Sequence, residues 1–352
     1  MPDEQLPKYI DLGGQIVHPQ PVKIEGMRMF GFVFVAQPPS ENSGQAHLQQ
    51  KLCDLALNSH PDRIYNYHAL SSHFMLTFTD SQKLSSADEI GYVRELSTTF
   101  WLFTVAVRRG MVPIPERLVL YVPYIFVDNQ YSLVGGREAY GIRKSIGQFK
   151  IPEDFTQVDS LTTRTLAFKF FSPETEAKIQ QIVEVRRTDQ VQSDETLHQW
   201  DHPHELSKSL MNTMVGEEGQ AALEGLEETV DLPGLLPKVS VPLVFIKQFR
   251  DSEAAPDAIY QAIVEAPCRL LDVPKVGLLP GEYHLDVSHA DSHPIDVDMG
   301  VPAAGLKAEL AFWSELDFII DTGKVIQRWP SPLERTGCLP FGSFLSRFRS
   351  SA

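Results

Sequence analysis

Segments with the composition of β-strands recur at short intervals along this chain, and no long helical segments alternate with them. The segments that we interpret as strands are residues 27–36, 68–79, 94–107, 117–127, 162–171, 179–187, 239–249, 258–269, 281–287 and 309–320. Aromatic and β-branched residues, which favour strands, are dense in them. Strands that follow one another this closely pair most simply as antiparallel neighbours. The sequence therefore predicts an α+β protein with a mainly antiparallel β core.

Two segments have a different character. Residues 47–57 show the apolar spacing of a short helix. Residues 190–236 are polar, acidic and rich in helix-forming residues, with Pro203, Pro233 and Pro237 at or near their ends. We interpret this stretch as a helical insertion or lid, and a linker is the alternative.

The last segment, residues 329–352, is rich in serine and proline and is expected to form a C-terminal arm. Its phenylalanines at positions 341, 344 and 348 are suited to docking on a neighbouring subunit, which predicts a homo-oligomer. The remaining residues, 23–328, are expected to form one domain that contains the insertion.

Charge and composition exclude several classes of protein. The 352 residues include 46 acidic and 31 basic ones, a net charge of −15 that disfavours binding to nucleic acid or to anionic membranes. Cys53, Cys268 and Cys338 are too few and too scattered for a disulfide framework. The longest apolar run, residues 118–127, is far shorter than the ~20 residues of a membrane span. A cytoplasmic protein that binds no membrane is expected.

Lys144 stands in apolar surroundings. It follows the run VLYVPYIFV at 119–127 and lies within GGREAYGIRKSIGQFKIP at 135–152. Burial disfavours a charged ammonium group, so such a lysine must be solvated, paired or neutral. In an extended segment Ile142, Lys144 and Ile146 share one face, which surrounds the amine with apolar side chains. Lys144 is therefore a candidate for a reactive amine, and a lysine that reaches out to solvent is the alternative.

The order of residues around Lys144 resembles the active-site segment of the acetoacetate decarboxylase family. A Gly-Arg-Glu run at 136–138 leads to Gly-Ile-Arg-Lys at 141–144, and Lys144 takes the place of the family's Schiff-base lysine. The resemblance covers most of residues 23–328. It implies a barrel-like, mainly antiparallel domain.

The same resemblance suggests roles for three further residues. Arg28 takes the place of an active-site arginine and would bind a substrate carboxylate, while Glu95 takes the place of a glutamate that positions this arginine or moves a proton. Tyr140 would shape the substrate pocket. From the residues alone, an ion pair of Arg28 with Glu25, and of Glu95 with a neighbour such as Arg94, are the alternatives.

The resemblance implies a Schiff-base lyase, first a decarboxylase, that acts on a small keto acid such as acetoacetate. The same imine would also support a hydratase, aldolase or cyclase. A non-catalytic module that binds a ligand on this fold is the alternative from a different class. The chain departs from the family at Arg143 and Ser145, which replace a proline and a second lysine, and near Met75, where a second acidic residue is usual.

Histidine and aspartate residues gather between positions 284 and 298. Both residue types bind divalent metals. Their spacing follows no recognised ligand pattern, so we interpret them as polar surface residues. The sequence predicts neither a metal nor another cofactor.

Overall fold

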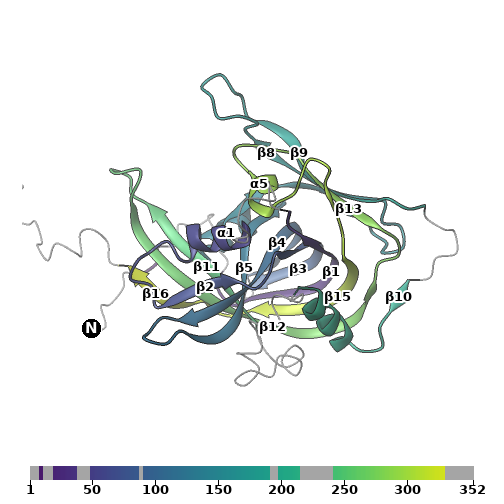
Figure 1. Ribbon diagram of the computed structural model, residues 1–352, viewed down its shortest axis with the longest axis horizontal. Coiled ribbons are helices and arrows are strands. Elements are labelled where there is room, and N and C mark those ends of the chain that lie inside the picture. Colours follow the sequence, from purple (N-terminus) through teal and green to yellow (C-terminus); the bar gives the residue numbers. More distant parts are fainter. Residues whose placement is uncertain are drawn as a thin grey trace, which may run out of the picture.

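The fold is built mainly from long antiparallel strands, as the sequence predicts (Figure 1). The computed structural model describes residues 8–10, 19–37, 48–86, 90–190, 197–214 and 241–329. Most of the predicted strands are present, several of them longer than expected, because turn residues inside a segment do not always end a strand.

Seven strands of the described chain form a ring. They are β1 (Val22–Val35), β3 (His73–Ser86), β4 (Tyr92–Arg108), β5 (Ile114–Val127), β11 (Val241–Arg250), β12 (Ala258–Leu278) and β15 (Leu310–Ile320). They pair in the order β4-β3-β1-β15-β12-β11-β5, and β5 pairs back with β4. All of these pairings are antiparallel except the one between β5 and β11, which is parallel and short. The prediction of a mainly antiparallel barrel is confirmed.

Four short strands extend this sheet beyond the ring. They are β2 (Tyr65–Ala69), β6 (Lys144–Ile146), β10 (His198–Gln199) and β16 (Lys324–Trp329). Of these, β2 pairs with β4, β6 pairs in parallel with β5, and β10 and β16 pair with β12. The pairing of β6 with β5 fixes Lys144 opposite Ile125 and so attaches the predicted reactive lysine to the ring.

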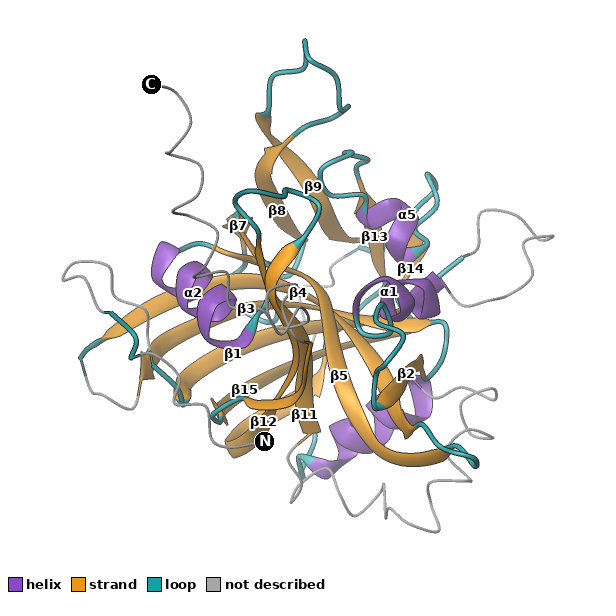
Figure 2. Cartoon of the chain, turned by 90° about the vertical axis from the view of Figure 1, so that its left-hand side faces the viewer, coloured by secondary structure: helices purple, strands orange, loops and turns teal. Residues whose placement is uncertain are grey.

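A second, smaller sheet packs against the first (Figure 2). Its strands are β7 (Gln148–Lys150), β8 (Ser160–Ala167), β9 (Lys178–Arg187), β13 (Tyr283–Val287) and β14 (Leu306–Lys307). Strands β8 and β9 form an antiparallel hairpin, which projects at the top of Figure 1. Phe30, Phe32 and Phe34 of β1 belong to the same buried cluster as Val183 and Leu285, so one face of the ring forms the main core with the smaller sheet.

The named helices are short. They are α1 (Leu48–Ala56), α2 (Gln130–Gly135), the π-helix η1 (Gly136–Tyr140) and α5 (Ile295–Met299). A further helix covers residues 204–214, which confirms a helical segment within the predicted insertion. Residues 191–196 and 215–240 of that region, and the predicted arm after Trp329, lie outside the described residues. No helix in the described part of the chain is long and apolar enough to cross a membrane.

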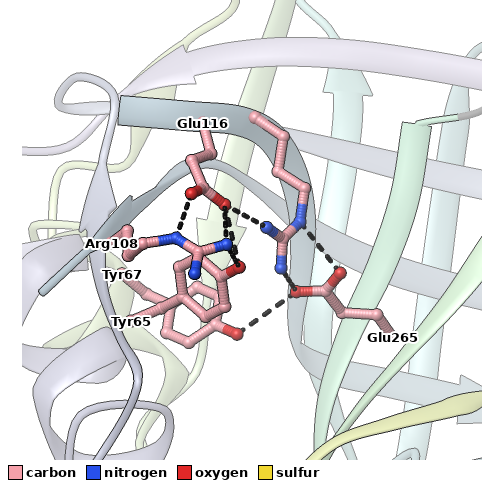
Figure 3. A network of polar contacts seen from close by, with 6 residues as sticks. Tyr65, Tyr67, Arg108, Glu116 and Glu265 are labelled. Carbon is pink, nitrogen blue, oxygen red and sulfur yellow. Dashed lines mark hydrogen bonds and ion pairs between the residues drawn. The ribbon is translucent and has the colours of Figure 1, made fainter. Parts of the chain in front are cut away.

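A network of charged and phenolic side chains ties β2, β4, β5 and β12 together (Figure 3). Arg117 donates to both carboxylate oxygens of the buried Glu265, at 3.0 and 2.6 Å, and Tyr67 donates to the same carboxylate at 3.2 Å. The Tyr65 hydroxyl donates to Glu116 at 2.8 Å, and Arg108 pairs with that glutamate. Because each buried charge has a partner, the network is consistent with a structural role.

Candidate active site

A cavity of about 320 Å³ lies against the face of the ring that is turned away from the smaller sheet. Every strand of the ring contributes to its wall, together with α2, η1 and β6. Apolar side chains make up most of the lining. They include Val22, Ile24, Met27, Met29, Leu84, Trp101, Leu120, Val122, Ile125, Leu243, Phe245, Leu316, Phe318 and Ile320. Such a concave apolar site with a few polar groups is typical of small-molecule binding.

Lys144 lines this cavity and is 8% exposed. Its Nζ donates a hydrogen bond to the hydroxyl of Ser132 and lies 3.6 Å from Oε2 of Glu95. Of the described residues that line the cavity, Lys144 is the one cation and Glu95 the one anion. The structure therefore brings two of the predicted residues together in one apolar site.

Ser132, which was not predicted from the sequence, holds the amine from the first turn of α2. The side chain of Asn129 caps this helix and accepts a hydrogen bond from the backbone N–H of Ser132 at 2.8 Å. This cap fixes the position of the serine hydroxyl relative to Lys144. The Asn-x-x-Ser spacing of a helix start was the available signal, but it does not reveal which side chain the serine meets.

The π-helix η1 makes room for the lysine chain. A methyl group placed on Gly136 would lie 2.7 Å from Cε of Lys144, so only glycine allows this approach. Gly141 ends η1 with φ of 87°, and its Cα packs against the backbone of Lys247. Arg137 donates to the carbonyl of Lys144 at 3.1 Å and thereby joins η1 to β6.

Glu95 is 6% exposed, and its Oε2 atom accepts no hydrogen bond within the described residues. Buried polar atoms are nearly always hydrogen-bonded, so an oxygen in this state is notable. It faces Lys144 across 3.6 Å. The alternative pairing with Arg94 is wrong, because Arg94 binds Asp80 at 2.7 Å.

Tyr140 lines the cavity, and its hydroxyl donates to the carbonyl of Ile320 at 3.1 Å. Burial raises the pKa of this phenol, so it stays protonated at neutral pH. The ring of Tyr140 therefore forms part of the wall while its hydroxyl is held by the backbone. The role of Tyr140 in shaping the pocket stays a prediction, and the position of its ring in the cavity wall is consistent with that role.

Arg28 does not reach the cavity. Its guanidinium pairs with the buried Asp80 and donates to the backbone carbonyl of Glu153. It lies on the face of β1 that carries Phe30, whereas Met27 and Met29 face the cavity. The expected convergence of Arg28 on Lys144 is therefore not found, and the pairing of Arg28 with Glu25 considered as the alternative is not found either.

Ile146 also differs from expectation. It is 46% exposed and does not line the cavity, whereas Ile142 is buried and does. Ile146 is the last residue of β6, one step of the alternation beyond Lys144, and there the strand has already passed the edge of the cavity. The apolar surroundings of Lys144 come instead from the ring strands.

Two other groups could react with an electrophile near this site. Burial raises the pKa of the Cys268 thiol to about 12, and the Asp321 carboxylate adds to the shift, so this cavity-lining thiol is a poor nucleophile at neutral pH. Burial lowers the pKa of Lys247, but this amine donates to the carbonyl of Ala139 at 3.3 Å and is not among the residues that line the cavity.

The geometry can be compared with known proteins. No protein-family model matches the sequence, and no curated protein matches it. A crystal structure of acetoacetate decarboxylase from Legionella pneumophila superimposes with a TM-score of 0.52 at 12% identity, covering 93% of this chain and 94% of that one. This chain has the acetoacetate decarboxylase fold.

The enduracididine biosynthesis enzyme MppR has the same fold. Its complex with pyruvate superimposes with a TM-score of 0.51 at 10% identity, covering 90% of this chain and 93% of that chain. The resemblance noted in the sequence thus holds for the architecture of nearly the whole chain. At identities this low, the superpositions establish the fold alone, and the chemistry has to be argued from the residues of the site.

Proposed function

We propose that this protein is an enzyme in which Lys144 forms a Schiff base with the carbonyl group of a keto acid, and that its reaction is decarboxylation. The observation that carries the proposal is the placement of the Lys144 amine, buried in an apolar cavity between the Ser132 hydroxyl and the Glu95 carboxylate. Burial disfavours the charged form of an amine, so a lysine that served only the structure would be expected to reach solvent. The burial of Lys144 beside a cavity is therefore better explained by reaction with a bound substrate.

The chemistry follows from an amine and a carboxylate side by side. The neutral amine of Lys144 adds to the carbonyl carbon, and loss of water leaves a protonated imine. Glu95 is close enough to take a proton from the adding amine and to return it to the leaving hydroxyl. Ser132 keeps Nζ in place during both steps.

In a β-keto acid the protonated imine accepts the electron pair of the bond to the carboxyl carbon. Carbon dioxide leaves, the resulting enamine takes a proton on carbon, and water releases the ketone. The positive imine and the negative carboxylate cancel as the bond breaks, and apolar surroundings favour a step that removes charge. The mostly apolar lining of this cavity therefore supports decarboxylation.

The fold neighbours support a keto acid as substrate class. One is named for acetoacetate, and another was solved with pyruvate. One observation favours a second candidate, an aldolase, hydratase or cyclase that uses the same imine. Arg28, expected to bind the carboxylate, is paired with Asp80 outside the cavity. Product analysis separates these reactions, because only decarboxylation releases carbon dioxide.

The test uses wild-type protein, Lys144→Met and the matched control Lys150→Met, since Lys150 is an exposed lysine of β7. Each is incubated with acetoacetate, pyruvate and longer β-keto acids, and carbon dioxide release is measured. We expect release with wild type and Lys150→Met and none with Lys144→Met. If Lys144→Met retains the activity, the assignment of the lysine is wrong. If no protein acts on any keto acid, the chain is better described as a ligand-binding module.

A further inference from the structure

The cavity is larger than a small keto acid needs. A cavity of about 150 Å³ takes up benzene, with its six carbon atoms, so 320 Å³ has room for roughly a dozen non-hydrogen atoms. Acetoacetate has seven. A substrate as small as acetoacetate would leave apolar wall facing empty space, which forfeits the contacts that stabilise a bound ligand.

The reactive groups lie on one side of the ring. Lys144 belongs to β6, which pairs with β5, and Glu95 belongs to β4, which also pairs with β5. A carbonyl group that reacts with Lys144 must therefore lie at the β4–β5 wall. The remaining atoms of the substrate extend from there into the cavity.

The wall farthest around the ring from this point is apolar. Around the ring, β1 is the third strand from β5 in one direction and β15 is the third strand in the other. There Ile24 and Met27 of β1 and Leu316 of β15 form a cluster with Leu84 of the adjoining β3, and all four line the cavity. Since this cluster offers neither charge nor hydrogen bonds from its side chains, it suits a hydrocarbon chain and not a second carboxylate.

Several polar side chains elsewhere in the lining form hydrogen bonds with one another. Thr79 and Ser97 share a hydrogen bond of 2.6 Å, and Trp101 donates to Thr77 at 2.8 Å. These pairs remove hydrogen-bonding capacity from the middle of the cavity and leave it suited to apolar atoms.

The helix 204–214 covers another part of the cavity face. Ser207 lines the cavity. Leu206, Leu210 and Met211 pack with Val33 and other residues of the ring. This helix belongs to residues 190–236, the stretch interpreted from the sequence as a helical insertion or lid, so an element of that insertion helps to bound the space for the substrate.

From these observations we propose that the substrate is a β-keto acid with an aliphatic chain, of about eight carbon atoms in all, whose chain lies against the wall of Ile24, Met27, Leu84 and Leu316. The proposal rests on the proposed function. The reaction consumes one proton and one β-keto acid and yields one carbon dioxide and one methyl ketone. The water lost when the imine forms is regained when the ketone is released.

The experiment measures kcat/KM for β-keto acids of four, six, eight, ten and fourteen carbon atoms. Burial of each methylene group strengthens binding about fourfold, so we expect roughly a fifteenfold rise for each added pair up to about eight carbons, then a plateau or fall. A rate that is highest for acetoacetate, or that keeps rising to fourteen carbons, overturns the proposal while the proposed function stands.

A variant tests where the chain lies. Leu316→Phe narrows the far wall without adding charge, and Leu166→Phe makes the same change at an exposed leucine of β8. We expect Leu316→Phe to lose at least tenfold more activity on the eight-carbon acid than on acetoacetate, and Leu166→Phe to behave as wild type. Equal losses of Leu316→Phe on both acids contradict the proposed direction of the chain.

A binding measurement separates this proposal from the imine chemistry. Methyl ketones of three to nine carbon atoms, the products of the proposed reaction, are added to the wild-type protein and the shift in Tm is recorded. A shift that grows with chain length to about seven carbons supports the apolar site even if no keto acid is turned over, in which case only the proposed reaction fails. A shift in Tm that does not depend on chain length overturns the inference.

Discussion

The Nζ atom of Lys144 lies 3.6 Å from Oε2 of Glu95, at one wall of a cavity whose lining is otherwise mostly apolar. The two residues come from β6 and β4, and β5 lies between these strands and pairs with both. An ion pair in such a place costs desolvation energy, and replacing it with apolar residues is often neutral or stabilising. Its presence therefore favours a chemical role over a structural one.

Glu95→Gln tests the role of the carboxylate. The amide keeps the size of the side chain and removes its charge and its capacity to carry a proton. We expect decarboxylation to fall at least a hundredfold, the range in which general acid–base catalysis contributes, while the protein still folds. Glu138→Gln is the control, because Glu138 accepts a hydrogen bond from Tyr9 and does not line the cavity. An unchanged rate for Glu95→Gln would show that Glu95 takes no part in proton transfer.

Gly136→Ala tests the close approach of the lysine chain. Gly136 has ordinary helical angles, so alanine causes no backbone strain, but its methyl group would lie 2.7 Å from Cε of Lys144. We expect a loss of tenfold or more in the rate of imine formation, with a change in Tm of a few degrees at most. Gly110→Ala is the matched control, since its methyl group would meet no atom closer than 3.5 Å. Imine formation at the wild-type rate in Gly136→Ala would contradict this geometry.

Ser132→Ala removes the hydroxyl that accepts from Lys144. The amine then loses a fixed partner, and we expect kcat for decarboxylation to fall about tenfold with little change in KM, because a group that positions the amine acts mainly on the reaction step. Ser132→Thr keeps the hydroxyl and should restore most of the rate. A rise in KM alone would mean that Ser132 acts on substrate binding.

Asp80→Asn tests the structural role now assigned to Arg28. Burial opposes ionisation of Asp80, but hydrogen bonds from Arg94 and Arg28 outweigh it, and the pKa of Asp80 is lowered. A lowered pKa means that the carboxylate stabilises the folded state above its unfolded-state pKa of ~3.9, and that this stabilisation is lost as the pH falls through the folded-state pKa.

The asparagine variant should therefore lose about 2 kcal/mol of unfolding free energy at pH 7, and the loss should shrink as the pH falls below about 4. Urea unfolding of wild type, Asp80→Asn and the exposed control Asp257→Asn between pH 3 and pH 7 checks this. A loss that is the same at every pH would place the effect in packing instead of charge.

Local composition predicted the strands, and the contiguous motif around Lys144 predicted the fold and a lysine in apolar surroundings, which the structure buries in the cavity wall. Glu95 was predicted through resemblance, and its side chain faces the cavity. Arg28 was predicted in the same way and faces the opposite side. The difference arises at a bulge between Ile24 and Met27, where Gly26 adopts φ of 60°.

Both Ile24 and Met27 line the cavity, so the bulge shifts the alternation of β1 by one residue. Strict alternation from Ile24 would have placed Arg28 in the cavity. Ser132 could not be found from sequence for a different reason. Its contact with Lys144 depends on how α2 returns to β6, which no local pattern specifies.

Reduction of the imine, followed by mapping of the modified residue, shows directly whether Lys144 forms a Schiff base. Wild-type protein is treated with borohydride in the presence of a β-keto acid, digested, and analysed by mass spectrometry. We expect one modified peptide with the added mass on Lys144. It should be absent without the keto acid and absent in Lys144→Met. Modification of Lys247 in place of Lys144, or modification that is spread evenly over the exposed lysines, would contradict the assignment of Lys144 as the Schiff-base lysine.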